Sequence, residues 1–122
     1  LLNMLINFPN ENYVEKLEIV SKSKASIVHN RLNHGMPQLK SRSFESAFCK
    51  SLILCRKDNF PLTMETWFTE GKHFLYYENL EETLTHVLAN YSDYHDMIEE
   101  TYQYAMNRYT CKHFVQDFLV GR

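Results

Sequence analysis

The sequence predicts an α/β fold: a partial Rossmann-like domain with a small parallel sheet and a helical C-terminal third. Two short apolar runs, ASIVHN at 25–30 and SLILC at 51–55, are rich in aliphatic residues, as buried strands are. A loop and a short helical segment lie between them, which gives the strand, loop, helix, strand order of a parallel pair. After position 79, apolar residues recur mostly at helical spacing.

The elements of the first half follow in order from local patterns. Residues 10–23 carry apolar side chains at helical spacing, with acidic residues early and lysines late, which favours a helix. The strand at 25–30 leads into a loop at 31–43 that contains glycine and proline. A short helix at 44–50 then precedes the second strand, 51–55.

The second half contains another long loop, one more strand and a series of helices. Residues 56–71 form the predicted loop, and HFLYY at 73–77 forms a brief aromatic strand. Asn79 starts a helix with a glutamate three residues on, as in a capping box. Ser92 is expected to cap the next helix, and Thr110 the last one.

Composition excludes several classes of protein. The 122 residues fit one domain, 1–122, and 44% hydrophobic with 23% charged residues is ordinary globular usage. A net charge of -2 gives no footprint for nucleic acid, and the apolar start at 1–8 is too short to span a membrane and lacks a targeting pattern. Three cysteines without a paired spacing favour a reduced, cytoplasmic setting. No histidine spacing predicts a metal site.

A candidate anion site lies in KSRSFE at 40–45. Basic and hydroxyl side chains surround the expected start of the helix, where backbone N–H groups and a partial positive charge suit a phosphate or diphosphate. A carboxylate one turn in suits sugar hydroxyls, and a histidine beside Gly35 follows the first strand, where open α/β sheets bind ligands. The candidate binding residues are His34, Lys40, Ser41, Arg42, Ser43 and Glu45; no catalytic residue is assigned.

A plainer interpretation of the same stretch concerns folding alone. Ser41 or Ser43 would cap the helix, Glu45 would favour its dipole, and Lys40 and Arg42 would be solvated loop charges. Residue chemistry by itself favours this interpretation.

The order of motifs in the last two-thirds of the chain resembles a known family. RSFESAFCKSLILC, then EGKHFLYYENLEETLTHVL, then NRYTCKHFVQDFL resemble the C-terminal part of group 1 glycosyltransferases of the GT-B class, most of all the spore-protein-type branch. The matched positions are Arg42, Phe44, Glu45, Cys49, Glu65, Phe68, Gly71, Tyr76, Leu80, Glu81, Glu82, Leu84, Tyr109 and His113. Two positions depart from the pattern: Lys50 replaces a glycine, and Pro37 replaces a glutamate.

The resemblance implies a nucleotide-sugar donor site on half of a GT-B fold, with no metal and no cofactor besides the donor substrate. Glu45 corresponds to the glutamate that holds the donor ribose, and Arg42 with the helix start corresponds to the region facing the diphosphate. The acceptor would bind a separate N-terminal half or a partner chain, because this chain is too short for both halves. The chain begins without methionine and is interpreted as a fragment of a longer transferase or a reduced form, inactive in isolation, and its truncated sheet suggests self-association. The alternative is a non-catalytic Rossmann-like module that uses its helical C-terminus to bind a partner protein.

Overall fold

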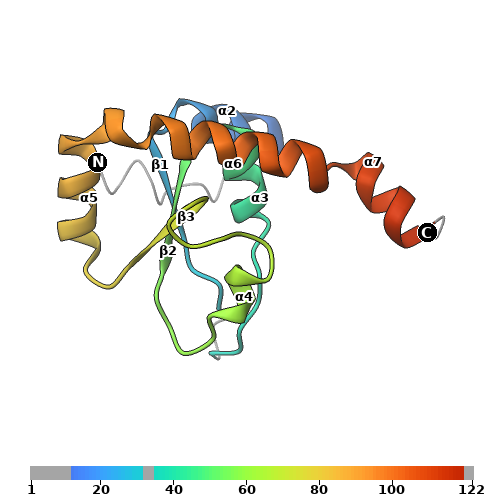
Figure 1. The fold of residues 1–122 in the computed structure, drawn as a ribbon, viewed down its shortest axis with the longest axis horizontal. Helices are drawn as coiled ribbons and strands as arrows, with labels where there is room; N and C mark the ends of the chain where they lie inside the picture. Colours follow the sequence, from blue (N-terminus) through green and yellow to red (C-terminus); the bar gives the residue numbers. More distant parts are fainter. Residues whose placement is uncertain (1–11, 32–34, 120–122) are drawn as a thin grey trace.

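The structure, a computed structural model, describes residues 12–31 and 35–119. Helices follow strands through the first half of the chain, and the described part ends in a run of helices (Figure 1). The elements are α2 (Tyr13–Lys22), β1 (Ala25–Val28), α3 (Arg42–Phe48), β2 (Leu52–Arg56), α4 (Leu62–Glu65), β3 (Phe74–Tyr77), α5 (Leu80–Ala89), the 3-10 turn η1 (Tyr91–Tyr94), α6 (His95–Arg108), α7 (Cys111–Phe114) and the π-helical η2 (Val115–Leu119).

The described residues form a three-stranded parallel sheet in the order β1-β2-β3. Ala25 of β1 pairs with Leu52 of β2, and Ile53 of β2 pairs with Phe74 of β3. The predicted α/β class, the small parallel sheet and the helical C-terminal part are therefore confirmed.

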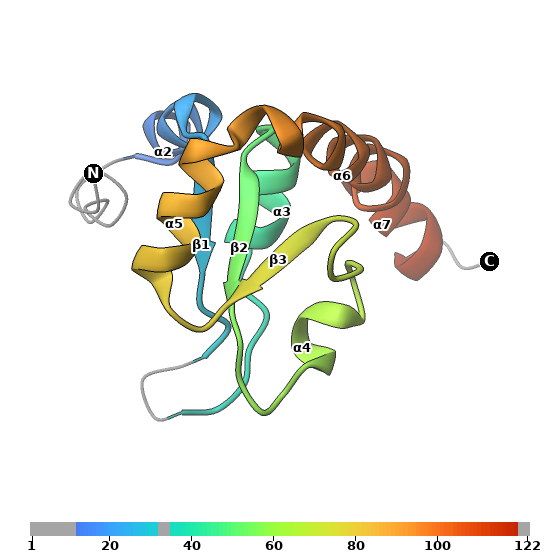
Figure 2. The ribbon, with the colours of Figure 1, turned by 60° about the vertical axis from the view of Figure 1, so that its left-hand side comes forward.

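Helices cover both faces of the sheet (Figures 1 and 2). Ile53 and Cys55 pack in one buried cluster with residues of α3 and α6. Leu52 and Leu54 pack in the other, with residues of α5 and the start of α6. Since successive side chains of a strand point to opposite faces, β2 is buried on both sides, as the central strand of a parallel sheet should be.

The carboxyl ends of all three strands lie at one edge of the sheet because the strands are parallel. The long loops after β1 and β2 extend from this edge, and α4 lies beside it (Figure 2). The loop after β1 ends at the amino-terminal end of α3, which packs against both β1 and β2. The expected ligand edge of an open α/β sheet therefore includes the stretch 40–45.

The predicted helix caps are confirmed at some helices and wrong at others. The side chain of Asn79 accepts from Glu82 N at 3.1 Å, and Thr110 Oγ1 accepts from His113 N at 3.4 Å, as predicted. The prediction for Ser92 is wrong, since it lies within η1 and α6 begins at His95. Ser41 does occupy the cap position of α3, but its hydroxyl makes no capping bond.

The carboxyl end of α3 has the geometry of a Schellman motif. Ser51 N donates to Ser46 O at 2.9 Å, and Lys50 N donates to Ala47 O at 3.3 Å. Lys50 has φ 56, in the left-handed region that favours glycine. The glycine expected from the resemblance therefore has a backbone reason, and Lys50 adopts that conformation without being glycine.

Two further segments differ from prediction. The loop expected at 56–71 contains the short helix α4, which starts after Pro61, a residue compatible with a helix start. The last helix is divided into α7 and the π-helical η2. Among the described residues, no helix combines the length and apolar character needed to cross a bilayer.

Candidate functional site

A buried asparagine shapes the loop that leads from β1 to α3. Asn30 O accepts from Gln38 N at 3.0 Å, and Asn30 Oδ1 accepts from Lys40 N at 3.1 Å. The amide of Asn30 is also close to Cys55 Sγ and Met64 Sδ. Asn30 thus fixes the backbone at Lys40. Sequence reasoning missed this role, although a polar residue at the end of a buried strand was a visible signal.

Glu45 is a buried carboxylate with one satisfied oxygen. It is 5% exposed, and its Oε1 accepts from Lys16 Nζ at 3.1 Å and from Ser41 Oγ at 3.0 Å. Its other oxygen, Oε2, is buried and has no hydrogen-bond partner. Most buried polar atoms in native proteins have a hydrogen-bond partner. Oε2 is an exception in the described structure, because it is a buried acceptor that receives no hydrogen bond.

The negative charge of Glu45 also affects its neighbours. Burial and then the charge of Glu45 raise the pKa of Cys49, one turn further along α3. Desolvation and then Glu45 likewise raise the pKa of Tyr13 in the first turn of α2. The charge of Glu45 therefore acts on both the first turn of α2 and the carboxyl end of α3.

The other candidate residues divide into partly exposed and buried groups. Lys40 and Arg42 are half-buried, and Lys40 Nζ donates to Gln38 Oε1 at 3.3 Å. Ser43 is fully buried, and its hydroxyl lies 3.6 Å from Met64 Sδ, which places it away from solvent. His34 lies outside the described residues. The structure thus brings Lys40, Ser41, Arg42 and Glu45 to one helix end and turns Ser43 into the core.

The start of α3 offers fewer backbone donors than the sequence predicts. Ser43 N donates to Lys40 O at 3.2 Å, and Glu45 N donates to Ser41 O at 3.0 Å. These two N–H groups are used within the turn itself. One of the first N–H groups of α3, that of Ser43, is therefore already engaged, and Lys40 and Arg42 supply positive charge beside this end.

A second network links the loops after β1 and β2. Arg31 Nε pairs with Asp58 Oδ2 at 3.3 Å, and its Nη1 donates to Gly35 O at 2.9 Å. The guanidinium also lies 4.8 Å from the centre of the Phe60 ring. Arg31 thus holds two loops of the carboxyl edge together. The sequence did not predict this role, because Arg31 and Asp58 are 27 positions apart.

An acidic hollow of about 590 Å³ lies beyond β2 and β3 on the same edge. Tyr76 donates to Glu65 Oε2 at 3.1 Å there, and burial followed by this contact raises the pKa of Tyr76. The lining residues are Lys57, Asp58, Pro61, Glu65, Glu70, Tyr76 and Glu78. Four carboxylates against one lysine disfavour a diphosphate, and the described residues contain no group of three or more side chains arranged to hold a metal ion.

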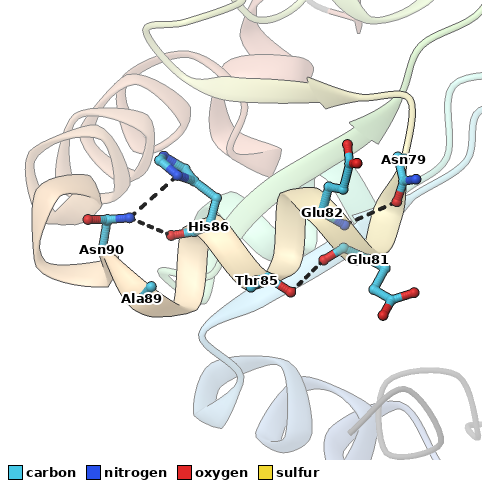
Figure 3. Close-up of a pocket in the computed structure, with 7 residues that line it drawn as sticks. All are labelled: Asn79, Glu81, Glu82, Thr85, His86, Ala89 and Asn90. Carbon is cyan, nitrogen blue, oxygen red and sulfur yellow. Dashed lines mark hydrogen bonds between the residues drawn. The ribbon is translucent and has the colours of Figure 1, made fainter.

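The hollow along α5 in Figure 3, about 640 Å³, has a structural explanation. Thr85 Oγ1 donates to Glu81 O at 2.8 Å, and Asn90 Nδ2 donates to His86 O at 2.9 Å. The side chains of Glu81 and Glu82 point apart in the figure. These groups complete the caps and turns of one helix and converge on no common point.

Three positions matched by the resemblance form an aromatic cluster. The rings of Phe44, Phe68 and Tyr109 have centroids 5.7, 5.2 and 5.5 Å apart, within the usual range for packed aromatic pairs. Trp67 joins them, and Tyr109 donates to its carbonyl oxygen. The motif R-x-F-E therefore places adjacent residues in different roles: Phe44 in packing and Glu45 at the open carboxylate.

Comparison with known proteins identifies a family. The model of a family described as glycosyl transferase-like matches residues 8–120, nearly the whole chain. No match was found among curated proteins or among solved structures. The match includes the sheet, α3 with Glu45, and the helical C-terminal part, and the chain therefore belongs to the glycosyl transferase-like family.

Proposed function

We propose that this chain is the donor-binding part of a glycosyltransferase that uses a nucleoside-diphosphate sugar. The buried, unpartnered Oε2 of Glu45 carries this proposal, because it is an acceptor that a ribose hydroxyl would satisfy. Membership of the glycosyl transferase-like family supports it.

Burial of the unpaired Glu45 oxygen explains why binding of a hydroxyl group there would be favourable. Leaving a buried acceptor without a donor costs about 1–3 kcal/mol, more for a charged group. A ribose hydroxyl that donates to Oε2 removes this cost, and a hydrogen bond to a carboxylate is among the stronger kinds. Lys16 and Ser41 already satisfy Oε1, so the ligand completes the carboxylate rather than competing for it.

Lys40 and Arg42 are the proposed diphosphate groups. Both are half-buried and lie within five residues of Glu45 in the sequence. Positive groups there would hold the donor and stabilise the diphosphate as it leaves, without a metal ion. His34 is proposed as a further donor to the same ligand, while Ser41 belongs to the site through its hydrogen bond to Glu45 Oε1.

The finer classification is part of the same proposal. We assign the chain to the C-terminal half of a GT-B enzyme of the spore-protein-type branch, with a separate half or a partner chain binding the acceptor. The sheet has two edge strands, β1 and β3, among the described residues, which suits extension by further strands or self-association.

One observation favours a second candidate function, a non-catalytic interaction module. α7 and η2 expose large apolar side chains: Phe114 is 56%, Val115 44% and Leu119 71% exposed. Such a surface suits contact with another protein. This function requires no nucleotide.

Nucleotide titration followed by NMR separates the two functions. UDP and GDP are added to the wild-type chain and to Arg42→Ala, Glu45→Ala and, as a matched control, Lys72→Ala, which removes the exposed ion pair with Glu100. We expect shifts within 34–45 and an affinity weakened about tenfold in the first two variants only. Absence of any shift at residues 34–45 with every nucleoside diphosphate would reject the transferase function and favour the module.

A further inference from the structure

We infer that Lys16, on α2, is a positioning residue that orients the Glu45 carboxylate so that Oε2 faces the donor ribose. This inference rests on the proposed function and adds a residue from outside the motif that contains Glu45. It makes the donor site depend on a second helix.

The contact joins two elements that are distant in sequence. Lys16 Nζ lies 3.1 Å from Glu45 Oε1, across 29 positions of the chain. The Lys16 side chain is 25% exposed and that of Glu45 only 6%. The helices α2 and α3 also pack against each other, and Cys49 Sγ lies 3.7 Å from Leu17 O, one residue beyond Lys16.

Burial separates this ion pair from those on the surface. In the pairs Lys50–Glu99 and Lys72–Glu100, every side chain is at least half exposed. Pairs of that kind contribute little, since water competes for both charges. Removing Lys16 would instead leave an almost entirely buried carboxylate without one of the two donors to its Oε1.

The positions of the donors determine which oxygen stays open. Lys16 and Ser41 both donate to Oε1, and a carboxylate oxygen accepts about two hydrogen bonds. Turning the carboxylate would break both contacts at once. With Lys16 removed, Ser41 alone would leave one contact, and the carboxylate would be free to turn about it.

The backbone of α2 holds Lys16 in place. Asn12 and Glu15 form a reciprocal capping box, and Lys16 N donates to Asn12 O at 2.9 Å in the first turn. The ammonium group also lies 6.0 Å from the Tyr13 ring centre. Lys16 is therefore presented from an ordered helix start, which suits a residue that must fix another side chain.

The test compares nucleotides with and without ribose hydroxyls. Affinities of UDP and GDP, and of their 2′,3′-dideoxy counterparts, are measured for wild type, Lys16→Met and Lys16→Arg, with Lys72→Met as the matched control. We expect wild type, Lys16→Arg and Lys72→Met to prefer the ribose form by about tenfold or more, and Lys16→Met to prefer it less than about threefold. A general loss of stability would weaken both forms equally and leave the preference unchanged.

Each outcome bears on one of the two proposals. An unchanged preference in Lys16→Met overturns the positioning role and leaves the donor site intact. No ribose preference in wild type rejects the proposed ribose contact itself, and the positioning role falls with it. If Lys16→Met does not fold, the ammonium resonance of Lys16 in wild type decides: it shifts with UDP or GDP and not with the dideoxy forms if Lys16 positions Glu45, and responds equally to both if it does not.

Discussion

The two ends of α3 differ in what the chain leaves incomplete. At the amino-terminal end, Glu45 has a buried oxygen without a donor, while the backbone turn is satisfied. At the carboxyl end, the hydrogen bonds of the Schellman motif are complete, but Lys50 occupies a conformation that favours glycine. A buried polar atom without a partner calls for a donor, whereas Lys50 has complete hydrogen bonds and only a conformational cost.

The largest expected effect is on stability and comes from Phe44, the neighbour of Glu45 in α3. Phe44→Ala removes a ring packed against Phe68 and Tyr109, and we expect a loss of about 3 kcal/mol in the free energy of unfolding. Urea denaturation followed by circular dichroism measures it. A loss below about 1 kcal/mol would show that the aromatic cluster does not support α3.

Glu45→Gln should reduce nucleotide affinity, whereas Phe44→Ala mainly reduces stability, and the effect of Glu45→Gln in free energy should be smaller. The amide keeps an oxygen for Lys16 and Ser41 but replaces the open carboxylate oxygen with a donor, so nucleotide affinity should fall about tenfold. Stability should fall by about 1–2 kcal/mol, less than in Phe44→Ala, since the buried pair with Lys16 loses its negative charge. Calorimetric titration with UDP and GDP measures the affinity, and a variant that binds like wild type would place the ribose elsewhere.

The sequence predicted local features of this fold well and tertiary ones poorly. The caps Asn79 and Thr110 follow from rules that act within four residues. Ser92 follows the same rule but failed, because a 3-10 turn precedes α6 and moves the helix start to His95. A capping residue thus indicates that a helix starts nearby without fixing where.

The sequence predicted the local part of the candidate site and missed the contacts that are distant in sequence. Its stretch, 40–45, was visible because basic, hydroxyl and acidic residues are adjacent in the chain. The burial of Ser43 depends on Met64, and the orientation of Glu45 depends on Lys16, contacts that span 21 and 29 positions. No local pattern carries such pairings. Lys50 was noticed through a resemblance, but only its positive φ explains why glycine is expected there.

Lys50→Gly tests the strain at the carboxyl end of α3. Glycine adopts a positive φ without steric cost, so we expect a gain of about 1 kcal/mol in the free energy of unfolding. The substitution also removes an exposed ion pair with Glu99, which contributes little. Lys50→Ala is the control, because it loses the same pair and keeps the strained backbone.

A higher free energy of unfolding in Lys50→Gly but not in Lys50→Ala would show that the positive φ of residue 50 destabilises the fold. Equal stability of the two variants would show that the left-handed conformation is not a burden. Nucleotide affinity should stay at the wild-type value in both, since Lys50 lies at the far end of α3 from Glu45.

The smallest expected effect concerns another buried atom without a partner, Nε2 of His73. Its ring stacks on Tyr104 with centroids 4.2 Å apart, and Nδ1 accepts from Thr69 N at 2.9 Å. Packed among aromatic rings and away from the ligand edge, this atom belongs to the core, unlike Glu45 Oε2.

Stability should therefore depend on pH through His73. Desolvation lowers its pKa below the ordinary value of 6.5, while Glu100 acts against this shift and Lys72 with it. Below pH 6.5 the unfolded chain binds a proton that the folded chain resists, so stability is fully present above this pH and is lost as the pH falls toward the folded pKa. In His73→Asn, an amide oxygen replaces Nδ1 as acceptor and nothing titrates. Melting temperatures of the two proteins between pH 7.5 and 5 should diverge only on the acid side, and parallel curves would show that His73 does not resist protonation in the folded chain.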